Sequence, residues 1–114
     1  WSWDNVGSGA ACHPNDVRVT YSITTLFPHW IPPADADPAL VARWTQFTEA
    51  LATHEDGHAI RVIENAYQVG EAIAGTSCAN VANAAQSALS SIRQISDQYD
   101  VDTQHGATQG AVWP

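Results

Sequence analysis

The stretch 37–75, DPALVARWTQFTEALATHEDGHAIRVIENAYQVGEAIAG, predicts the central helix of the fold. Asp37 followed by Pro38 is typical of a helix start, because aspartate accepts hydrogen bonds from free backbone N–H groups and proline has none to satisfy. Gly75 is a natural stop. Between them, apolar side chains recur at three- and four-residue steps, which is the spacing of one buried helix face. The stripe runs through Leu40, Trp44, Phe47 and Leu51, then His54 and His58, then Val62, Val69 and Ile73.

A straight helix of this length is too long for a small domain. At about 1.5 Å per residue, residues 38–74 would span about 55 Å. We therefore expect a bend or break near the start of the helix. Next along the chain, Thr76 or Ser77 is expected to cap a second helix, whose apolar positions run from Val81 to Tyr99. Two helices joined by so short a turn predict an antiparallel hairpin.

The remaining segments predict a small sheet. Residues 17–25 alternate apolar and polar side chains, which indicates a half-buried strand. Residues 1–6 alternate weakly and are joined to this strand through 7–14, as in a β-hairpin. Prolines exclude regular structure from 27–37, and residues 111–113 are a candidate returning strand. The predicted fold class is α+β, with a short antiparallel sheet of two or three strands packed on the helical hairpin.

Composition limits the possible partners. With 114 residues and 45% hydrophobic content, we expect one soluble, monomeric domain over residues 1–114. No apolar run approaches the roughly 18 residues of a membrane span. All four cations are arginines, scattered among twelve carboxylates, and the formal net charge is −8. Nucleic acid and anionic membrane surfaces are therefore not expected partners.

Two cysteines, Cys12 and Cys78, are present, and the chain contains no C-x-x-C pair and no methionine. An even cysteine count without metal-type spacing favours a disulfide, and the alternative is two buried thiols. A closed loop of about 66 residues would stabilise the fold by about 4 kcal/mol on the chain-entropy model. We expect a processed chain that is secreted, or located in the periplasm or outside the cell.

The sequence His54-Glu55-Asp56-Gly57-His58 lies within the predicted helix. Histidines four residues apart project from one helix face, so both imidazoles reach one Zn²⁺, while the adjacent glutamate can polarise a water. These histidines also occupy the apolar face, where burial without partners costs several kcal/mol. A metal supplies one partner for both. The alternative is a pair of core histidines that are hydrogen-bonded to backbone or carboxylate groups.

A catalytic zinc site needs a third protein ligand. If the hairpin turn centres on residues 75–78, antiparallel pairing places Tyr99 opposite His54, so the tail after Tyr99 reaches the metal. His105 is the histidine in that tail and ranks first. The tail aspartates rank second, and Glu64 ranks last because continuation of the helix turns it roughly 120° off the face. The aspartates are Asp100 and Asp102.

Further residues accompany the histidine motif at both ends of the chain. They are Trp30-Ile31-Pro32, Trp44, Phe47, and the tail Tyr99-Asp100-x-x-Thr103-x-His105-Gly106-x-x-Gln109-Gly110. From about residue 12 to residue 113, the chain resembles bacterial secreted proteins that are described as predicted zinc-dependent proteases of unknown function. The resemblance implies His54, His58 and His105 as metal ligands and Glu55 as the general base.

The expected function is that of a secreted zinc metallopeptidase with a reduced, gluzincin-like zincin fold. In this hypothesis Glu55 takes a proton from a zinc-activated water, and the substrate is a peptide or protein. Tyr99 is a candidate donor to the oxyanion, although core packing is its more common role. Asp100 and Asp102 are candidates to orient a ligand imidazole by a hydrogen bond to the ring nitrogen that does not bind the metal.

Two alternatives to this function stay open. One is a zinc hydrolase of a non-protein substrate, such as a cell-wall peptide, ester or glycan, because metal-activated water attacks any suitable carbonyl. The other is a secreted binding module in which the metal holds the helix to the tail without turnover. The second alternative predicts a closed site with four protein ligands.

Overall fold

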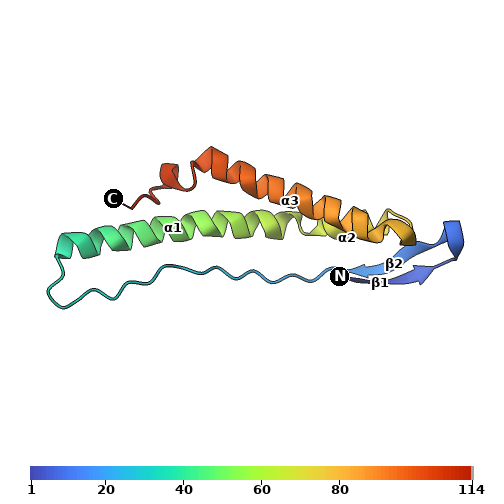
Figure 1. Ribbon diagram of the computed structural model, residues 1–114, viewed down its shortest axis with the longest axis horizontal. Helices are drawn as coiled ribbons and strands as arrows, with labels where there is room; N and C mark the ends of the chain where they lie inside the picture. Colours follow the sequence, from blue (N-terminus) through green and yellow to red (C-terminus); the bar gives the residue numbers. More distant parts are fainter. Residues whose placement is uncertain (114) are drawn as a thin grey trace. The chain divides into compact units, whose positions relative to one another are not determined.

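The computed structural model describes residues 1–113 and has an α+β fold (Figure 1). Its strands are β1 (Ser2–Val6) and β2 (His13–Arg18), and its helices are α1 (Pro38–Asn65), α2 (Tyr67–Ala74) and α3 (Val81–Thr103). Short 3₁₀ turns lie at Gly9–Ala11, Cys78–Asn80 and Ala107–Gln109. Chain contacts define two compact units. The first unit combines residues 1–22 with 61–96, and the second combines residues 23–60 with those from 97 onward.

The first unit contains the sheet and an apolar core. β1 and β2 form a two-stranded antiparallel sheet in which Ser2 pairs with Arg18 and Val6 with His13. β2 contacts α2. The core joins the apolar faces of α2 and α3 through Val69, Ile73, Val81, Ala85, Ala88 and Ile92, and Trp3, Val17 and Val19 pack against it. The predicted α+β class, with its hairpin sheet, is confirmed.

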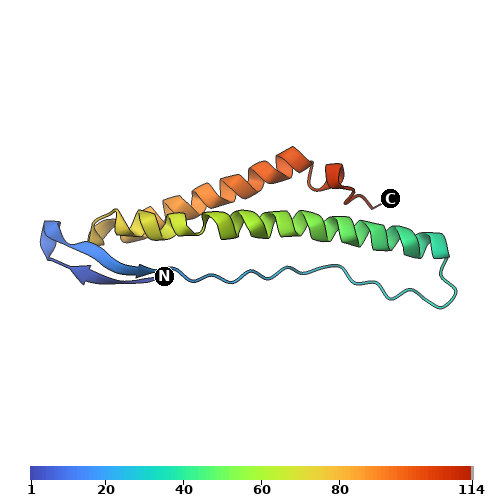
Figure 2. The same cartoon turned by 180° about the vertical axis from the view of Figure 1, so that it is seen from behind.

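The prediction of a strand over 17–25 was wrong in its bounds. β2 begins four residues earlier and ends at Arg18, and residues 19–25 form neither helix nor strand (Figure 2). Because Ser2 at the start of β1 already pairs with Arg18, residues 19–25 have no partner strand within residues 1–113. Tyr21 and Ile23 are exposed as a result. Alternation alone does not make a strand without a neighbour to accept its hydrogen bonds.

The long helix does break, but not near its start as predicted. Asp37 caps α1 by accepting a hydrogen bond from the Ala39 N–H (2.8 Å), and the helix runs unbroken to Asn65. There the Asn65 side chain donates to the Arg61 carbonyl (2.8 Å) and accepts from Gln68 (2.7 Å). Such side-chain bonds compete with the helical backbone ladder. After one intervening residue, α2 begins at Tyr67 and ends at Ala74, with Gly75 as its C-cap at the position where the sequence predicted the stop.

The tail differs from the expected returning strand. α3 continues four residues beyond Tyr99, to Thr103, and residues 111–113 have no regular structure. Gln104, His105 and Gly106 then all have positive φ angles, of 52°, 53° and 82°. Three consecutive left-handed residues cannot extend a right-handed helix, so the chain reverses direction here.

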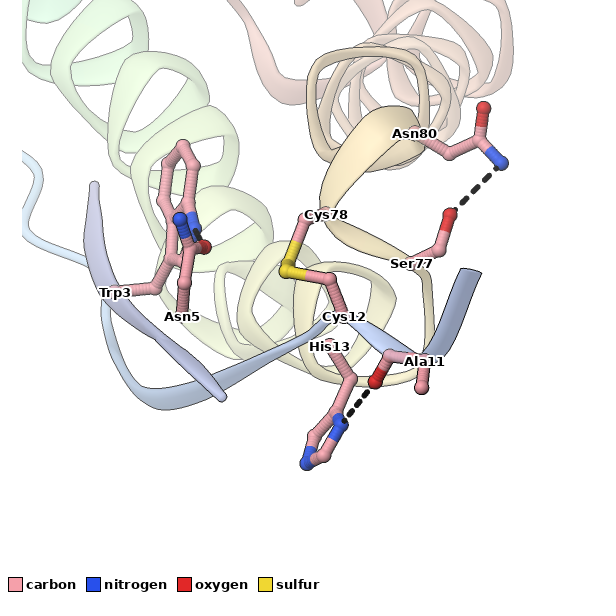
Figure 3. The surroundings of a disulfide bond; sticks show 8 residues. All are labelled: Trp3, Asn5, Ala11, Cys12, His13, Ser77, Cys78 and Asn80. Carbon is pink, nitrogen blue, oxygen red and sulfur yellow. Dashed lines mark hydrogen bonds between the residues drawn. A yellow bond between two sulfur atoms is a disulfide. The ribbon is translucent and has the colours of Figure 1, made fainter. Parts of the chain in front are cut away.

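Cys12 and Cys78 form a disulfide, as predicted (Figure 3). Their Cα atoms are 5.5 Å apart, and the Cys78 N–H donates to the Cys12 carbonyl. The bond ties the end of the β1–β2 connection to the turn before α3, across 66 residues of sequence. It is consistent with an extracellular or periplasmic location. Among residues 1–113, no helix combines the length and apolar character that a membrane span requires.

Candidate metal centre

α1 presents His54 and His58 from one face of the second unit. The pair are one helical turn apart, and their Nε2 atoms are 3.2 Å from each other. The side chain of His54 is only 5% exposed, and that of His58 is 22% exposed. Their place on the apolar stripe, after Trp44, Phe47 and Leu51, explains this burial.

α3 brings a carboxylate to the histidine pair. Asp100 Oδ1 lies 3.2 Å from the Nε2 atoms of both His54 and His58, so the three atoms form a nearly equilateral triangle. Zinc bonds imidazole nitrogen and carboxylate oxygen at about 2.0–2.2 Å, and two ligands of a tetrahedral zinc are therefore about 3.3 Å apart. The donor types and their spacing both fit one face of a zinc tetrahedron.

A hydrogen bond behind His54 defines which of its nitrogens faces the cluster. His54 Nδ1 donates to Gln109 Oε1 (3.0 Å), and the Thr103 hydroxyl lies 3.5 Å from the same nitrogen. A neutral imidazole protonated at Nδ1 has only a lone pair at Nε2. In this neutral form, Nε2 and Asp100 Oδ1 face one another as two acceptors, and a cation shared by both would remove that repulsion. Metal-bound histidines in proteins are oriented by such outer hydrogen bonds.

Tyr99 packs between the histidines and Gly57. Its ring stacks on His54, with centroids 5.0 Å apart and an interplanar angle of 16°, and meets His58 edge-on. The hairpin geometry predicted this position opposite His54. The Tyr99 hydroxyl accepts a hydrogen bond from Gln109 Nε2 (2.9 Å). A Cβ atom on Gly57 would overlap the Tyr99 hydroxyl and ring, so this position requires glycine.

We expect Gly57→Ala to destabilise the protein by about 1–3 kcal/mol, because overpacking displaces Tyr99. Alanine otherwise favours a helix over glycine by up to about 1 kcal/mol, so the sign of the change is informative. Urea unfolding followed by circular dichroism measures it. Gly70→Ala is the matched control, because its Cβ would meet only Val19 at an ordinary 3.5 Å. A stabilised Gly57→Ala protein would contradict the close packing.

The chain reversal after α3 packs the following residues against the His54 ring. Gly106 packs so closely on the His54 ring that an added Cβ would lie 3.0 Å from its Cγ atom. The Gly106 N–H donates to the Thr103 hydroxyl, which itself donates to the Tyr99 carbonyl. The reversal brings Gln109 back to the histidine. A glycine with positive φ is therefore required for both the turn and the close approach.

The other predicted site residues have different surroundings. The His105 side chain is 82% exposed, and its Nδ1 is 3.6 Å from Asp100 Oδ1, so the structure does not bring it into the triangle. Asp100, which the sequence ranked second as the third ligand and also placed as an orienting residue, lies with its Oδ1 atom in the triangle itself. Asp102 is exposed and accepts a hydrogen bond from Gln98. Glu64 is exposed and lies outside the cluster, and Glu55 is half-buried beside His54.

Three residues that surround His54 were not among the functional residues proposed from the sequence. They are Gly57, Thr103 and Gln109. Each belongs to a motif quoted above, the histidine motif or the T-x-H-G-x-x-Q-G tail. The available signal was their place in these two motifs, next to candidate ligands whose imidazoles need outer hydrogen bonds.

The fold and site together define an α+β protein with a histidine-carboxylate cluster carried by two helices. The chain belongs to the family described as bacterial protein of unknown function (DUF922), whose model matches residues 1–106. No curated protein and no solved structure matches the chain significantly.

Proposed function

We propose that this protein is an exported zinc-dependent metallopeptidase with a reduced zincin-like fold. In the proposal His54, His58 and Asp100 hold the metal and Glu55 is the general base. The observation that carries it is the triangle of three donor atoms, each about 3.2 Å from the others. When His54 is neutral and protonated at Nδ1, its Nε2 atom and the Asp100 carboxylate face each other as acceptors, which also favours a cation at this place.

An open coordination position supports a catalytic rather than a structural metal. Within residues 1–113, the cluster offers three donors, whereas structural zinc sites are usually closed by four protein ligands. A bound zinc ion supplies Lewis acidity, which polarises a carbonyl and makes water acidic near neutral pH. The donor set is therefore suited to hydrolysis.

Glu55 is the chain's proton carrier in this proposal. It follows His54 directly on α1 and is half-buried. Among residues 1–113, its side chain forms no hydrogen bond or ion pair. Its carboxylate takes a proton from the attacking water as the C–O bond forms. It then delivers the proton to the leaving nitrogen as the C–N bond breaks.

Tyr99 has a positioning role in this proposal. Its hydroxyl is bonded to Gln109, and its ring supports His54 and His58. Gln109 and Thr103 hold His54 from the other side. Pre-organised ligands of this kind bind metal more tightly, because less side-chain freedom is lost on binding.

A non-catalytic, metal-stabilised module is the second candidate function. The position of His105 favours it, because Nδ1 is only 3.6 Å from Asp100 Oδ1 and the exposed side chain has room to rotate. A fourth protein donor would close the site and exclude a water. The contrast between His105 and Asp100 variants in the Discussion separates the two candidates.

Metal removal and return test the proposed function. Protein purified without chelator is expected to contain about one zinc per chain and to cleave members of a peptide library. A chelator should remove both properties, and added zinc should restore both. Elemental analysis measures the metal, and mass spectrometry detects cleavage.

Each result of that test has a defined meaning. A protein that neither contains nor takes up a transition metal would contradict the proposal. Zinc-dependent cleavage of esters or glycans, with all peptides intact, would keep the metal centre but replace the substrate class. A double variant, His54→Ala with His58→Ala, is the control for adventitious metal.

A further inference from the structure

An aromatic hollow lies in the second unit, on the helix that carries the histidines. Trp30, Leu40, Trp44 and Trp113 line an open space of about 380 Å³. The ring of Trp44 meets those of Trp30 and Trp113 edge-on, at centroid distances of 5.8 and 5.1 Å. Open apolar hollows on small proteins are typical of binding sites, since exposed apolar area is costly.

The chemistry of the lining selects the kind of group that it accepts. Four apolar side chains offer only indole N–H donors and no side-chain acceptor. Sugar hydroxyls need both donors and acceptors, whereas an aliphatic or aromatic side chain needs neither. The lining therefore favours a bulky apolar side chain over a glycan.

The net charge of this unit indicates the charge of the ligand that carries the apolar group. The unit holds eight of the twelve carboxylates but only one of the four arginines, Arg43. The carboxylates are Asp35, Asp37, Glu49, Glu55, Asp56, Asp97, Asp100 and Asp102. A bound dication would leave the unit strongly negative. Such a surface attracts cationic ligands and repels a second copy of itself.

The hollow is within reach of a substrate held at the metal cluster. Trp44 and His54 both lie on the apolar stripe of α1 and are ten residues apart, which is about 15 Å along the helix axis and roughly 80° around it. An extended peptide covers that length in four or five residues. The tail also borders both places, because Gly106 packs on His54 and Trp113 packs on Trp44.

We propose that this hollow binds a bulky apolar side chain of a cationic peptide or protein substrate, a few residues from the scissile bond. Cleavage of that substrate rests on the proposed function, but its binding does not. The hollow supplies the apolar contact, and the carboxylates of the same unit attract lysine and arginine side chains.

Calorimetric titration of Glu55→Gln protein with three ten-residue peptides tests the proposal without cleavage. One peptide is lysine-rich with a central phenylalanine, the second has alanine in its place, and the third replaces lysine by glutamate. The first is expected to bind at least about tenfold more tightly than the other two. Raising the salt concentration should weaken its binding.

Two variants locate the binding in the hollow. Trp30→Ala removes one wall, and Leu40→Trp fills the space without making a cavity. Each should abolish the preference for phenylalanine over alanine, while the zinc content stays unchanged. Trp1→Ala, an exposed tryptophan of the first unit, is the matched control.

Three results would overturn the proposal. They are an unchanged phenylalanine preference in both hollow variants, equal binding of the glutamate peptide, and equal or tighter binding of a neutral oligosaccharide. A protein that binds the cationic peptide selectively but holds no zinc and cuts nothing would contradict the proposed function alone. The two failures are therefore distinguishable.

Discussion

Glu55→Gln is expected to lower kcat by at least about a hundredfold while leaving the zinc content unchanged. A positioned general base contributes about 10²–10⁴-fold to such reactions, and an amide of nearly the same shape cannot take the proton. Metal content should be preserved, because the three candidate donor atoms belong to His54, His58 and Asp100 and not to Glu55. Loss of turnover without loss of metal separates a proton-transfer role from a ligand role.

The measurement is kcat on a peptide that the native protein cleaves, together with elemental analysis of both proteins. Glu49→Gln is the matched control, because Glu49 is an exposed carboxylate six residues earlier on α1. It removes the same charge from the same helix and should leave kcat nearly unchanged. Retained turnover in Glu55→Gln would exclude this glutamate as the base.

The start and end of the long helical region followed from local signals in the sequence. Asp37 caps the first turn, and Gly75 ends α2. Such capping depends on residues that are neighbours in sequence, so it is visible without the fold. The disulfide was also predictable, because two cysteines allow a single pairing.

The errors arose where the outcome depends on distant partners or on particular side-chain bonds. The alternating pattern of residues 17–25 could not show that the first residue of β1, Ser2, pairs with Arg18 and leaves no partner in β1 for the residues after it. The helix break coincides with the hydrogen bond from the Asn65 side chain to the Arg61 carbonyl, which is one of several bonds that asparagine can make. Periodicity detects an apolar face but not either of these events.

The candidate site was predictable from the sequence only where it depends on helical spacing and hairpin pairing. Helical periodicity places His54 and His58 together, and hairpin pairing places Tyr99 against His54. The choice of third donor depends instead on where α3 ends. Because α3 continues to Thr103, Asp100 stays on the helix and faces the histidines. The left-handed residues that follow leave the His105 side chain exposed, and such positive φ angles in non-glycine residues are rare.

Asp100→Asn is expected to weaken zinc binding by at least about a hundredfold, whereas His105→Ala should change it only slightly. Loss of groups that merely orient a ligand already costs about 10–100-fold in metal affinity, so loss of a direct charged donor costs more. Asparagine keeps the shape of the side chain, which limits the effect on folding. Competition with a chelator of known affinity measures the change in each variant.

Asp102→Asn is the control for charge, because it removes one carboxylate two residues further along α3 on the exposed surface. Equal weakening by the Asp100 and Asp102 variants would mean that net charge, rather than coordination, controls zinc affinity. A large loss of zinc affinity in His105→Ala would instead place this histidine in the coordination shell. That result would indicate a closed site with four protein donors. If turnover also rises in His105→Ala, the native His105 side chain blocks access of substrate to the metal.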